Sequence, residues 1–449
     1  MGSRRNHELV LLAFAGAVTA GAYALASLGR NASIPADLLP FLLFVMALLL
    51  GAHLVLRWRA PYADPTILPI VALLNGLGYV FIVRLASDID DASALPGQQA
   101  TWTAVGIIAF TVVLVAVPRA KVLDKYRYLA AIAGIGLLIL PLLPGIGRTV
   151  NGARIWVSAG PISFQPGEFA KIALAIFLAS YLAEKREMLQ RTRWKVGGLY
   201  VPELKHLAPV LAAWGASLVV MVFERDLGSS LLILLLVIVM LWVATARTTF
   251  LLVGSGLFLA GGWAASTQFA HVSDRLDIWL RPFDDPNGVG FQPVEASFAL
   301  ANGGLTGTGP GRGEPFRIPE VETDFIFAAI GEELGLIGSV GILVAFLILV
   351  TSGLRIAMGT RDDFGKLLAT SLSALIGIQA FIIIGGVIRI VPLTGITLPF
   401  VSYGGSSLVS NYVLVALLLR ISHDGAMRPD LGESDEPANN EALSSTGAS

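Results

Sequence analysis

The sequence predicts an all-α polytopic membrane protein with about twelve transmembrane helices. Three observations support this class: high hydropathy, long apolar runs and an uneven distribution of basic residues between loops. Of the 449 residues, 55% are hydrophobic and 14% are charged, and the mean hydropathy is +0.73. A water-soluble core cannot hide that much apolar surface. We therefore expect the helices to bury their side chains in lipid and against one another.

Twelve apolar runs are long enough to cross about 30 Å of hydrocarbon as helices of roughly 17–25 residues. The first run follows a very short polar segment and has no small-residue cleavage motif at its end, which predicts a retained helix and not a signal peptide. The runs lie at 8–28, 38–57, 66–84, 101–117, 127–144, 168–184, 207–224, 227–244, 248–266, 326–352, 367–388 and 400–420.

The basic residues orient these runs. If the N-terminus is cytoplasmic, the inner loops hold most of the 31 Lys and Arg residues, as the positive-inside rule requires. This predicts that both termini are cytoplasmic and that residues 267–323 form one large extracytoplasmic loop. The polar tail 425–449 has no apolar periodicity, so we expect it to be disordered.

Charge and composition also exclude some functions. A net charge of −1 gives no excess positive charge for binding nucleic acid. The absence of cysteine excludes disulfides and thiolate metal sites. The five histidines are scattered along the chain, so they do not predict a zinc site.

Four segments on the predicted outer side are rich in Gly, Pro and polar residues, and together they are expected to cover one cavity. They are 144–168, 224–230, 271–323 and 389–407. Within the longest, Asp284–Gly288 predicts a turn. Its glycines at 303–313 indicate either a flexible loop or a weak anion nest, without the spacing of a nucleotide P-loop.

The acidic segment 319–335, PEVETDFIFAAIGEELG, is the first candidate for chemistry. It takes five carboxylates from a polar loop into an apolar run with no Lys or Arg, and carboxylates in a membrane are costly unless they are solvated, paired or used. Asp324 lies where loop meets helix. It is either a general base, with a pKa raised by burial and by Glu320 and Glu322, or a simple helix cap.

Three other segments place polar groups at the same predicted depth relative to the membrane as Asp324. Glu168 and Lys171 in FQPGEFAK form an i,i+3 pair that is either functional or architectural. Asp226 lies in a charged cluster with Glu224 and Arg225, where mutual neutralisation is the simplest interpretation. The segment 398–407, LPFVSYGGSS, either presents free N–H groups to an anion or packs closely through small residues. Its candidate residues are Ser402, Gly404, Gly405 and Ser406.

These motifs, in this order, resemble the SEDS family of shape, elongation, division and sporulation proteins, which includes RodA and FtsW. The resemblance covers residues 64–422 and rests on DPTILPI, FQPGEFAK, DLGSS, DPNGVGFQ, PEVETDFIFAAIGEELGLIG and LPFVSYGGSS. It implies a core of about ten helices at 64–424, an N-terminal two-helix extension at 1–63 and a cytoplasmic tail at 425–449.

The resemblance implies a peptidoglycan glycosyltransferase. Such an enzyme polymerises lipid II into glycan strands at the outer face of the cytoplasmic membrane, usually with a class B penicillin-binding protein as transpeptidase partner. The family's essential aspartate corresponds to Asp324, and its intramembrane pair to Glu168 and Lys171. The aspartate of its PDLG motif corresponds to Asp226, and its loop arginine to Arg275.

The chemistry implied needs a base for the attacking sugar hydroxyl and positive charge for the departing diphosphate. Asp324 is the candidate base. The candidates for the diphosphate are Arg275, Lys171, Arg154 and the backbone of Gly404–Ser406. Hard oxygen ligands are abundant, so Mg²⁺ or Mn²⁺ is a candidate cofactor, although no motif requires one. The chain departs from the family pattern at Gly167, at Arg225 and at Ile155, where Arg154 precedes the usual arginine position.

Two alternative functions use the same features. A lipid II flippase would also need a polar cavity and intramembrane charges, and a non-catalytic scaffold would only position the transpeptidase. Polymerisation of lipid II by the isolated protein would exclude the scaffold. Translocation without polymerisation would favour the flippase.

Overall fold

The computed structural model describes residues 2–34, 38–89, 92–150, 152–159, 162–190, 194–196, 199–201 and 204–427. Its helices are α1 (Gly2–Asn31), α2 (Leu38–Arg59), α3 (Ile67–Ala86), α4 (Leu95–Ala116), α5 (Arg127–Ile139), α6 (Gly167–Gln190), α7 (Leu204–Glu224), α8 (Leu227–Thr245), α9 (Thr249–Gln268), α10 (Ala270–Leu280), α11 (Phe291–Gly303), α12 (Ile326–Gly359), α13 (Asp363–Val387) and α14 (Gly405–Ala426). The five short strands are β1 (Gly147–Val150), β2 (Ala153–Ala159), β3 (Ile162–Phe164), β4 (Trp194–Val196) and β5 (Leu199–Val201).

The predicted membrane architecture is confirmed. Within the described residues, 11 helical spans are long and apolar enough to cross a membrane. The remaining predicted run, 168–184, lies on α6, a helix of 24 residues that carries Glu168 and Lys171 in its first turns. Each of the twelve predicted runs therefore coincides with a helix over most of its length.

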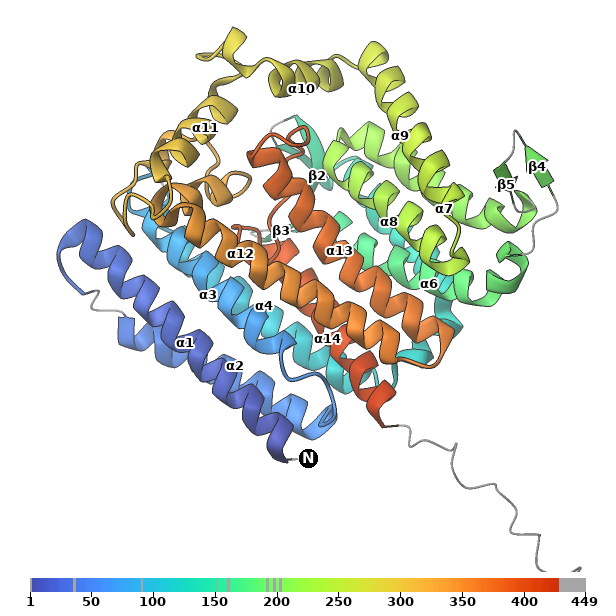
Figure 1. The fold of residues 1–449 in the computed structure, drawn as a ribbon, viewed down its shortest axis with the longest axis horizontal. Helices are drawn as coiled ribbons and strands as arrows, with labels where there is room; N and C mark the ends of the chain where they lie inside the picture. Colours follow the sequence, from blue (N-terminus) through green and yellow to red (C-terminus); the bar gives the residue numbers. More distant parts are fainter. Residues whose placement is uncertain are drawn as a thin grey trace, which may run out of the picture.

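The helices form one bundle whose centre is built from α3, α13 and α14. Most of the side chains on these three helices are buried inside the protein. Helices α1 and α2 lie along one flank of the bundle, beside α3 (Figure 1). The aromatic rings of Phe41 and Tyr79 stack at 4.0 Å between centroids, and Tyr23 packs edge-on against Phe41, which joins the three helices.

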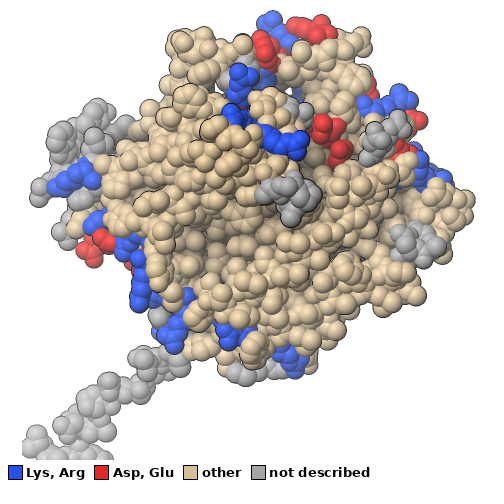
Figure 2. Space-filling view, turned by 180° about the vertical axis from the view of Figure 1, so that it is seen from behind, with Lys and Arg blue, Asp and Glu red and all other residues tan. Residues whose placement is uncertain are grey.

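The bundle has two ends, which we name by their residues. Helix α1 begins and α14 ends at the same end: Arg5 donates to the carbonyl of Ala63, and the N–H of Asp64 donates to Ser422 Oγ. The other end carries the long connections 269–325 and 388–404, and we call it the loop end. On the face drawn in Figure 2, a broad belt with few charged side chains separates the charged groups at the two ends.

The loop end contains more regular structure than the sequence predicted. Strands β1, β2 and β3 form an antiparallel sheet in which Arg148 pairs with Trp156 and Val157 pairs with Phe164. The dipeptide Asn151-Gly152 between β1 and β2 is a strong hairpin signal, and Gly152 has a φ of +81°. The predicted turn at Asp284–Gly288 is present, with Asp285 Oδ2 accepting from the N–H of Val289 at 3.2 Å.

Two predicted helix limits are wrong. The run 326–352 lies on α12, but that helix is broken at Gly335, whose φ of +66° and ψ of −163° are not helical. The last helix starts at Gly405 and not at 400. Ser402 Oγ accepts from the N–H of Leu398, and Phe400 has a φ of +65°, so the segment before Gly405 turns on itself and cannot be helical.

Candidate active site

Asp324 lies at the loop end, immediately before α12. The N-cap of α12 is Phe325, and no side chain caps the helix, so the interpretation of Asp324 as a simple helix cap is wrong. Its own N–H donates to the carbonyl of Glu320 at 3.1 Å. The carboxyl group therefore has no role in helix capping and is available for other chemistry.

The surroundings of Asp324 raise its basicity. Burial and, to a smaller extent, the Glu320 carboxylate raise the pKa of Asp324, the Arg275 guanidinium opposes both, and the resulting pKa is about 7. Arg275 and Asp324 approach each other around Gly395. A Cβ added at Gly395 would lie 3.5 Å from Asp324 Oδ2 and 3.8 Å from Arg275 Nη2. A base with a pKa near 7 is well matched to proton transfer at neutral pH.

Arg275 is positioned by the connection between α13 and α14. It comes from α10, and its Nη1 donates to the carbonyl of Leu393 at 3.0 Å. Arg275 also influences Asp226, whose pKa is raised by burial while the hydrogen bond from Ser229 and the Arg275 charge lower it. The structure thus brings Asp324, Arg275 and Asp226 into one electrostatically coupled group.

Asp226 has a clear local role. It is the N-cap of α8, and its Oδ1 accepts from the N–H of Ser229 at 2.9 Å. Glu168 also acts on Asp226 by raising its pKa, which places the start of α6 near the start of α8. A Cβ at Gly228 would lie 2.5 Å from Ile396 Cγ2, so α8 approaches the α13–α14 connection closely.

Glu168 and Lys171 form a buried ion pair with additional partners. Lys171 Nζ lies 2.6 Å from Glu168 Oε2 and donates to Gln379 Oε1 at 2.8 Å. Ser410 Oγ donates to the same Glu168 oxygen at 3.0 Å. The pair therefore joins α6 to α13 and α14, and an architectural role is part of its function.

Sequence reasoning missed three polar residues on α13 and on the α13–α14 connection. Gln379 Nε2 donates to the carbonyl of Thr397 at 2.8 Å, which links Lys171 to the α13–α14 connection. The hydroxyl oxygens of Thr394 and Thr397 are buried without a hydrogen-bond partner among the described residues. Both threonines lie in 389–407, which the sequence had marked as polar. Nothing in the sequence distinguished them from the neighbouring loop residues.

The segment LPFVSYGGSS braces the site through close contacts. Ser402 Oγ donates to the carbonyl of Thr323 at 2.5 Å, and the N–H of Tyr403 donates to the carbonyl of Glu322 at 2.8 Å. Ser406 Oγ accepts from the N–H of Gln165 at 2.9 Å. A Cβ at Gly405 would lie 2.3 Å from the Trp102 ring. The segment is therefore closely packed, and the first N–H groups of α14 begin at Gly405.

Arg154 is not brought into this group by any of its hydrogen bonds. It lies on β2, and its Nε and Nη2 donate to the carbonyls of Pro141 and Leu143 at 2.9 and 3.1 Å. Across the described part of the chain, no three His, Asp or Glu side chains come together as a metal-binding group.

The fold and the site together define a class: a polytopic helical membrane protein with a basic carboxylate and an arginine at one end of the bundle. Comparison with known proteins gives the family. The model of the cell cycle protein family FtsW/RodA/SpoVE matches residues 65–426. The chain is 46% identical over 434 residues to peptidoglycan glycosyltransferase RodA of Mycobacterium tuberculosis, covering 95% of this chain and 92% of the relative.

Solved structures agree with this result. A chain from a peptidoglycan synthase complex, described as coordinating polymerization and crosslinking, aligns with a TM-score of 0.67 and 26% identity over 82% of this chain and 99% of that one. Rod shape determining protein RodA of Thermus thermophilus aligns with a TM-score of 0.58 and 25% identity, covering 81% and 97%. The chain belongs to the FtsW/RodA/SpoVE family and is a multi-pass membrane protein with peptidoglycan glycosyltransferase activity.

Proposed function

We propose that this glycosyltransferase polymerises lipid II into glycan strands, with Asp324 as the general base. The supporting observation is the environment of Asp324: a carboxyl group outside any helix cap, with a pKa of about 7, beside the positive charge of Arg275. The site lies at the loop end, so the reaction takes place at the outer face of the cytoplasmic membrane if both chain ends are cytoplasmic, as the basic residues predict.

The proposed step is a substitution at a sugar carbon. Asp324 removes the proton from the attacking hydroxyl while the new glycosidic bond forms and the bond to the diphosphate breaks. The leaving lipid diphosphate takes the electron pair. Arg275, Lys171 and the first N–H groups of α14 at Gly405 and Ser406 are proposed to stabilise its negative charge.

The remaining candidate residues are proposed to position the groups that touch the substrate or to contact it farther from the reacting atoms. Asp226 and Glu168 act by orienting Arg275 and Lys171, and Ser402 and Gly404 act by fixing the backbone beside Asp324. Arg154, tied to the end of α5, is proposed to contact a more distant part of the polymer. A divalent cation, Mg²⁺ or Mn²⁺, would enter with the diphosphate, because phosphate oxygens complete the ligand set that Mg²⁺ usually has in proteins.

The proposed partner is a class B penicillin-binding protein that cross-links the new strand. The support is the synthase complex to which this chain is structurally similar, which coordinates polymerization with crosslinking. Copurification of the two proteins and a rise in glycan synthesis on mixing them would test this pairing.

The central test is polymerisation of purified lipid II by the isolated full-length protein. Asp324→Asn should lower the rate by at least about 100-fold, the range expected for loss of a general base, without loss of folded protein. Gly341→Ala on α12 is a matched control, because a Cβ there meets no other atom. Polymerisation retained by Asp324→Asn would remove this residue from the mechanism. Lipid II translocation without polymerisation by the wild type would favour a flippase instead.

A further inference from the structure

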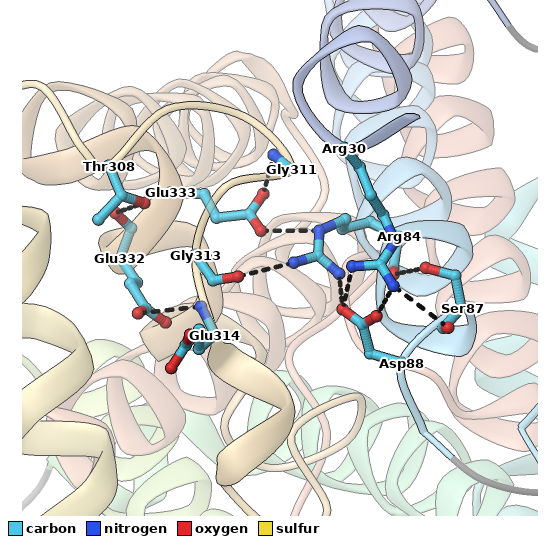
Figure 3. Close-up of polar contacts among 10 residues, drawn as sticks. All are labelled: Arg30, Arg84, Ser87, Asp88, Thr308, Gly311, Gly313, Glu314, Glu332 and Glu333. Atoms are coloured by element: carbon cyan, nitrogen blue, oxygen red, sulfur yellow. Dashed lines mark hydrogen bonds and ion pairs between the residues drawn. The ribbon is translucent and has the colours of Figure 1, made fainter. Parts of the chain in front are cut away.

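A polar cluster that is buried except at Arg30 joins α1 to the loop before Asp324 and to the first part of α12. It contains Arg30 at the end of α1, Arg84 in the last turn of α3, Asp88 just after α3, and Glu333 on the first part of α12 (Figure 3). We call these four residues the clasp. Glu333 belongs to the acidic segment that the sequence singled out, but Arg30, Arg84 and Asp88 were not candidates, because the partners that join them to Glu333 and α1 are distant along the chain.

The contacts of the clasp form a continuous chain. Arg30 Nη1 donates to Asp88 Oδ2 at 2.8 Å, and the same carboxylate pairs with Arg84. Arg84 Nε then donates to Glu333 Oε1 at 2.9 Å. Arg84 is 5% exposed and Glu333 is 1% exposed, so each charge depends on these partners for stability.

The clasp also holds the loop backbone. Arg84 Nη2 donates to the carbonyl of Gly313 at 2.8 Å, and the N–H of Gly311 donates to Glu333 Oε2 at 2.8 Å. Helix α1 touches this loop directly, because a Cβ at Gly29 would lie 2.0 Å from the carbonyl oxygen of Pro310 and one at Gly311 would lie 2.1 Å from that of Ala26. The loop is thus enclosed between α1 and α12.

The break in α12 makes this contact important for Asp324. Residues 326–334 form a short helix between Asp324 and the break at Gly335. Since regular helix geometry is interrupted at Gly335, the longer part of α12 does not fix the direction of this short helix. Its far end is fixed by backbone contact with α11 at Gly303 and by the clasp at Glu333.

We propose that the clasp is a positioning device for the proposed active site, by which α1 holds the short helix 326–334 and therefore Asp324. This inference rests on the proposed function, and it gives the N-terminal extension a role in polymerisation. Arg30 is the residue to change, because its side chain is about one-third exposed and its loss leaves the pair of Arg84 and Glu333 in place.

The experiment compares full-length Arg30→Gln, Arg30→Lys and wild type in lipid II polymerisation as a function of substrate concentration and pH. Arg30→Gln should lower kcat by about 10- to 100-fold, as expected for a displaced catalytic group, with KM unchanged. The acidic limb of the pH profile should move to lower pH, because a loosened loop admits water to Asp324. Three other charged groups act on Asp324, and none of them is altered in the Arg30 variants. They are Arg275, Glu320 and Glu322. Arg30→Lys keeps the charge and should restore most of the rate.

A matched control and a second readout separate positioning from folding. Arg127→Gln breaks another ion pair, with Glu184, and should leave the pH profile as in the wild type. Hydrogen exchange of residues 304–325 should be faster in Arg30→Gln than in Arg127→Gln. Hydrogen exchange does not depend on activity, so it tests the clasp even if the wild-type protein makes no glycan. Absence of glycan synthesis by the wild type would contradict the proposed function and not the clasp.

Two outcomes would overturn the positioning role. One is a rate and an exchange pattern in Arg30→Gln equal to those of the wild type. The other is a rate that falls by the same factor at every pH, with an unmoved acidic limb and unchanged exchange in 304–325, since that pattern indicates a general loss of folded protein.

Discussion

The reactivity of Asp324 comes from a balance between burial and two opposite charges. Removing a carboxylate from water favours its protonated form, and the Glu320 carboxylate acts in the same direction. The Arg275 guanidinium acts against both, which keeps the pKa at about 7. The same arginine is available to the departing diphosphate, so one cation serves the base and the leaving group.

The rate of polymerisation should depend on the protonation of Asp324. Because the base must be unprotonated, kcat/KM for lipid II should rise as the pH increases through about 7 and then level off. Arg275→Gln removes the charge that lowers the pKa of Asp324, so the midpoint should move to higher pH. Arg148→Gln on β1 is the control and should leave the midpoint unchanged. Initial rates across this range check the prediction, and an unmoved midpoint in Arg275→Gln would contradict it.

At the scale of elements, the short helix 326–334 depends on the glycine that ends it. Gly335 lies in a backbone region that is open almost only to glycine. A Cβ there would lie 2.3 Å from the N atom of Gly307 and 2.6 Å from the carbonyl oxygen of Leu305. The break lets the loop pair with α12, as the N–H of Leu336 donates to the carbonyl of Gly304 at 2.9 Å.

We therefore expect Gly335→Ala to lower the free energy of unfolding by about 1–3 kcal/mol through backbone strain and to reduce polymerisation. Gly341→Ala, in the regular part of the same helix, should be neutral or stabilising by up to about 1 kcal/mol. Thermal unfolding in detergent and lipid II assays compare the two. Equal stability of both variants would show that the break does not need a glycine.

The helices and the motif residues of the site could be predicted from the sequence, but the contacts between distant segments could not. The apolar runs predicted the helices because hydropathy is a local property, and Asp324, Arg275 and Asp226 were candidates through their motifs. The break at Gly335 was missed, since a glycine inside a predicted helix gives no sign of its backbone angles. Gln379 and the partners of Glu333 in the clasp were missed for another reason: Arg84 and Glu333 are far apart in the sequence, and only the packed bundle joins them.

At the scale of the whole molecule, the two ends of the bundle differ in function. The end where α1 begins and α14 ends carries neither Asp324 nor its partners. The loop end carries all of them. The distribution of basic residues predicts that the loop end faces outward, and the absence of cysteine offers a clean way to test this.

We expect Asp284→Cys, at an exposed position of the loop end, to react with a membrane-impermeant maleimide in intact cells. Lys121→Cys, exposed at the opposite end, should react only after the membrane is permeabilised. The cysteine-free parent is the background control. Labelling of Lys121→Cys in intact cells would reverse the orientation and place the site on the cytoplasmic side.

The division of α12 also bears on how the protein fits the thickness of the bilayer. The part after Gly335, residues 336–359, contains 24 residues (359 − 336 + 1), or about 36 Å of helix. That length alone exceeds the roughly 30 Å of a hydrocarbon core. The nine residues before Gly335 (334 − 326 + 1) are therefore not needed for the crossing, and their depth can follow the requirements of a lipid-linked sugar instead.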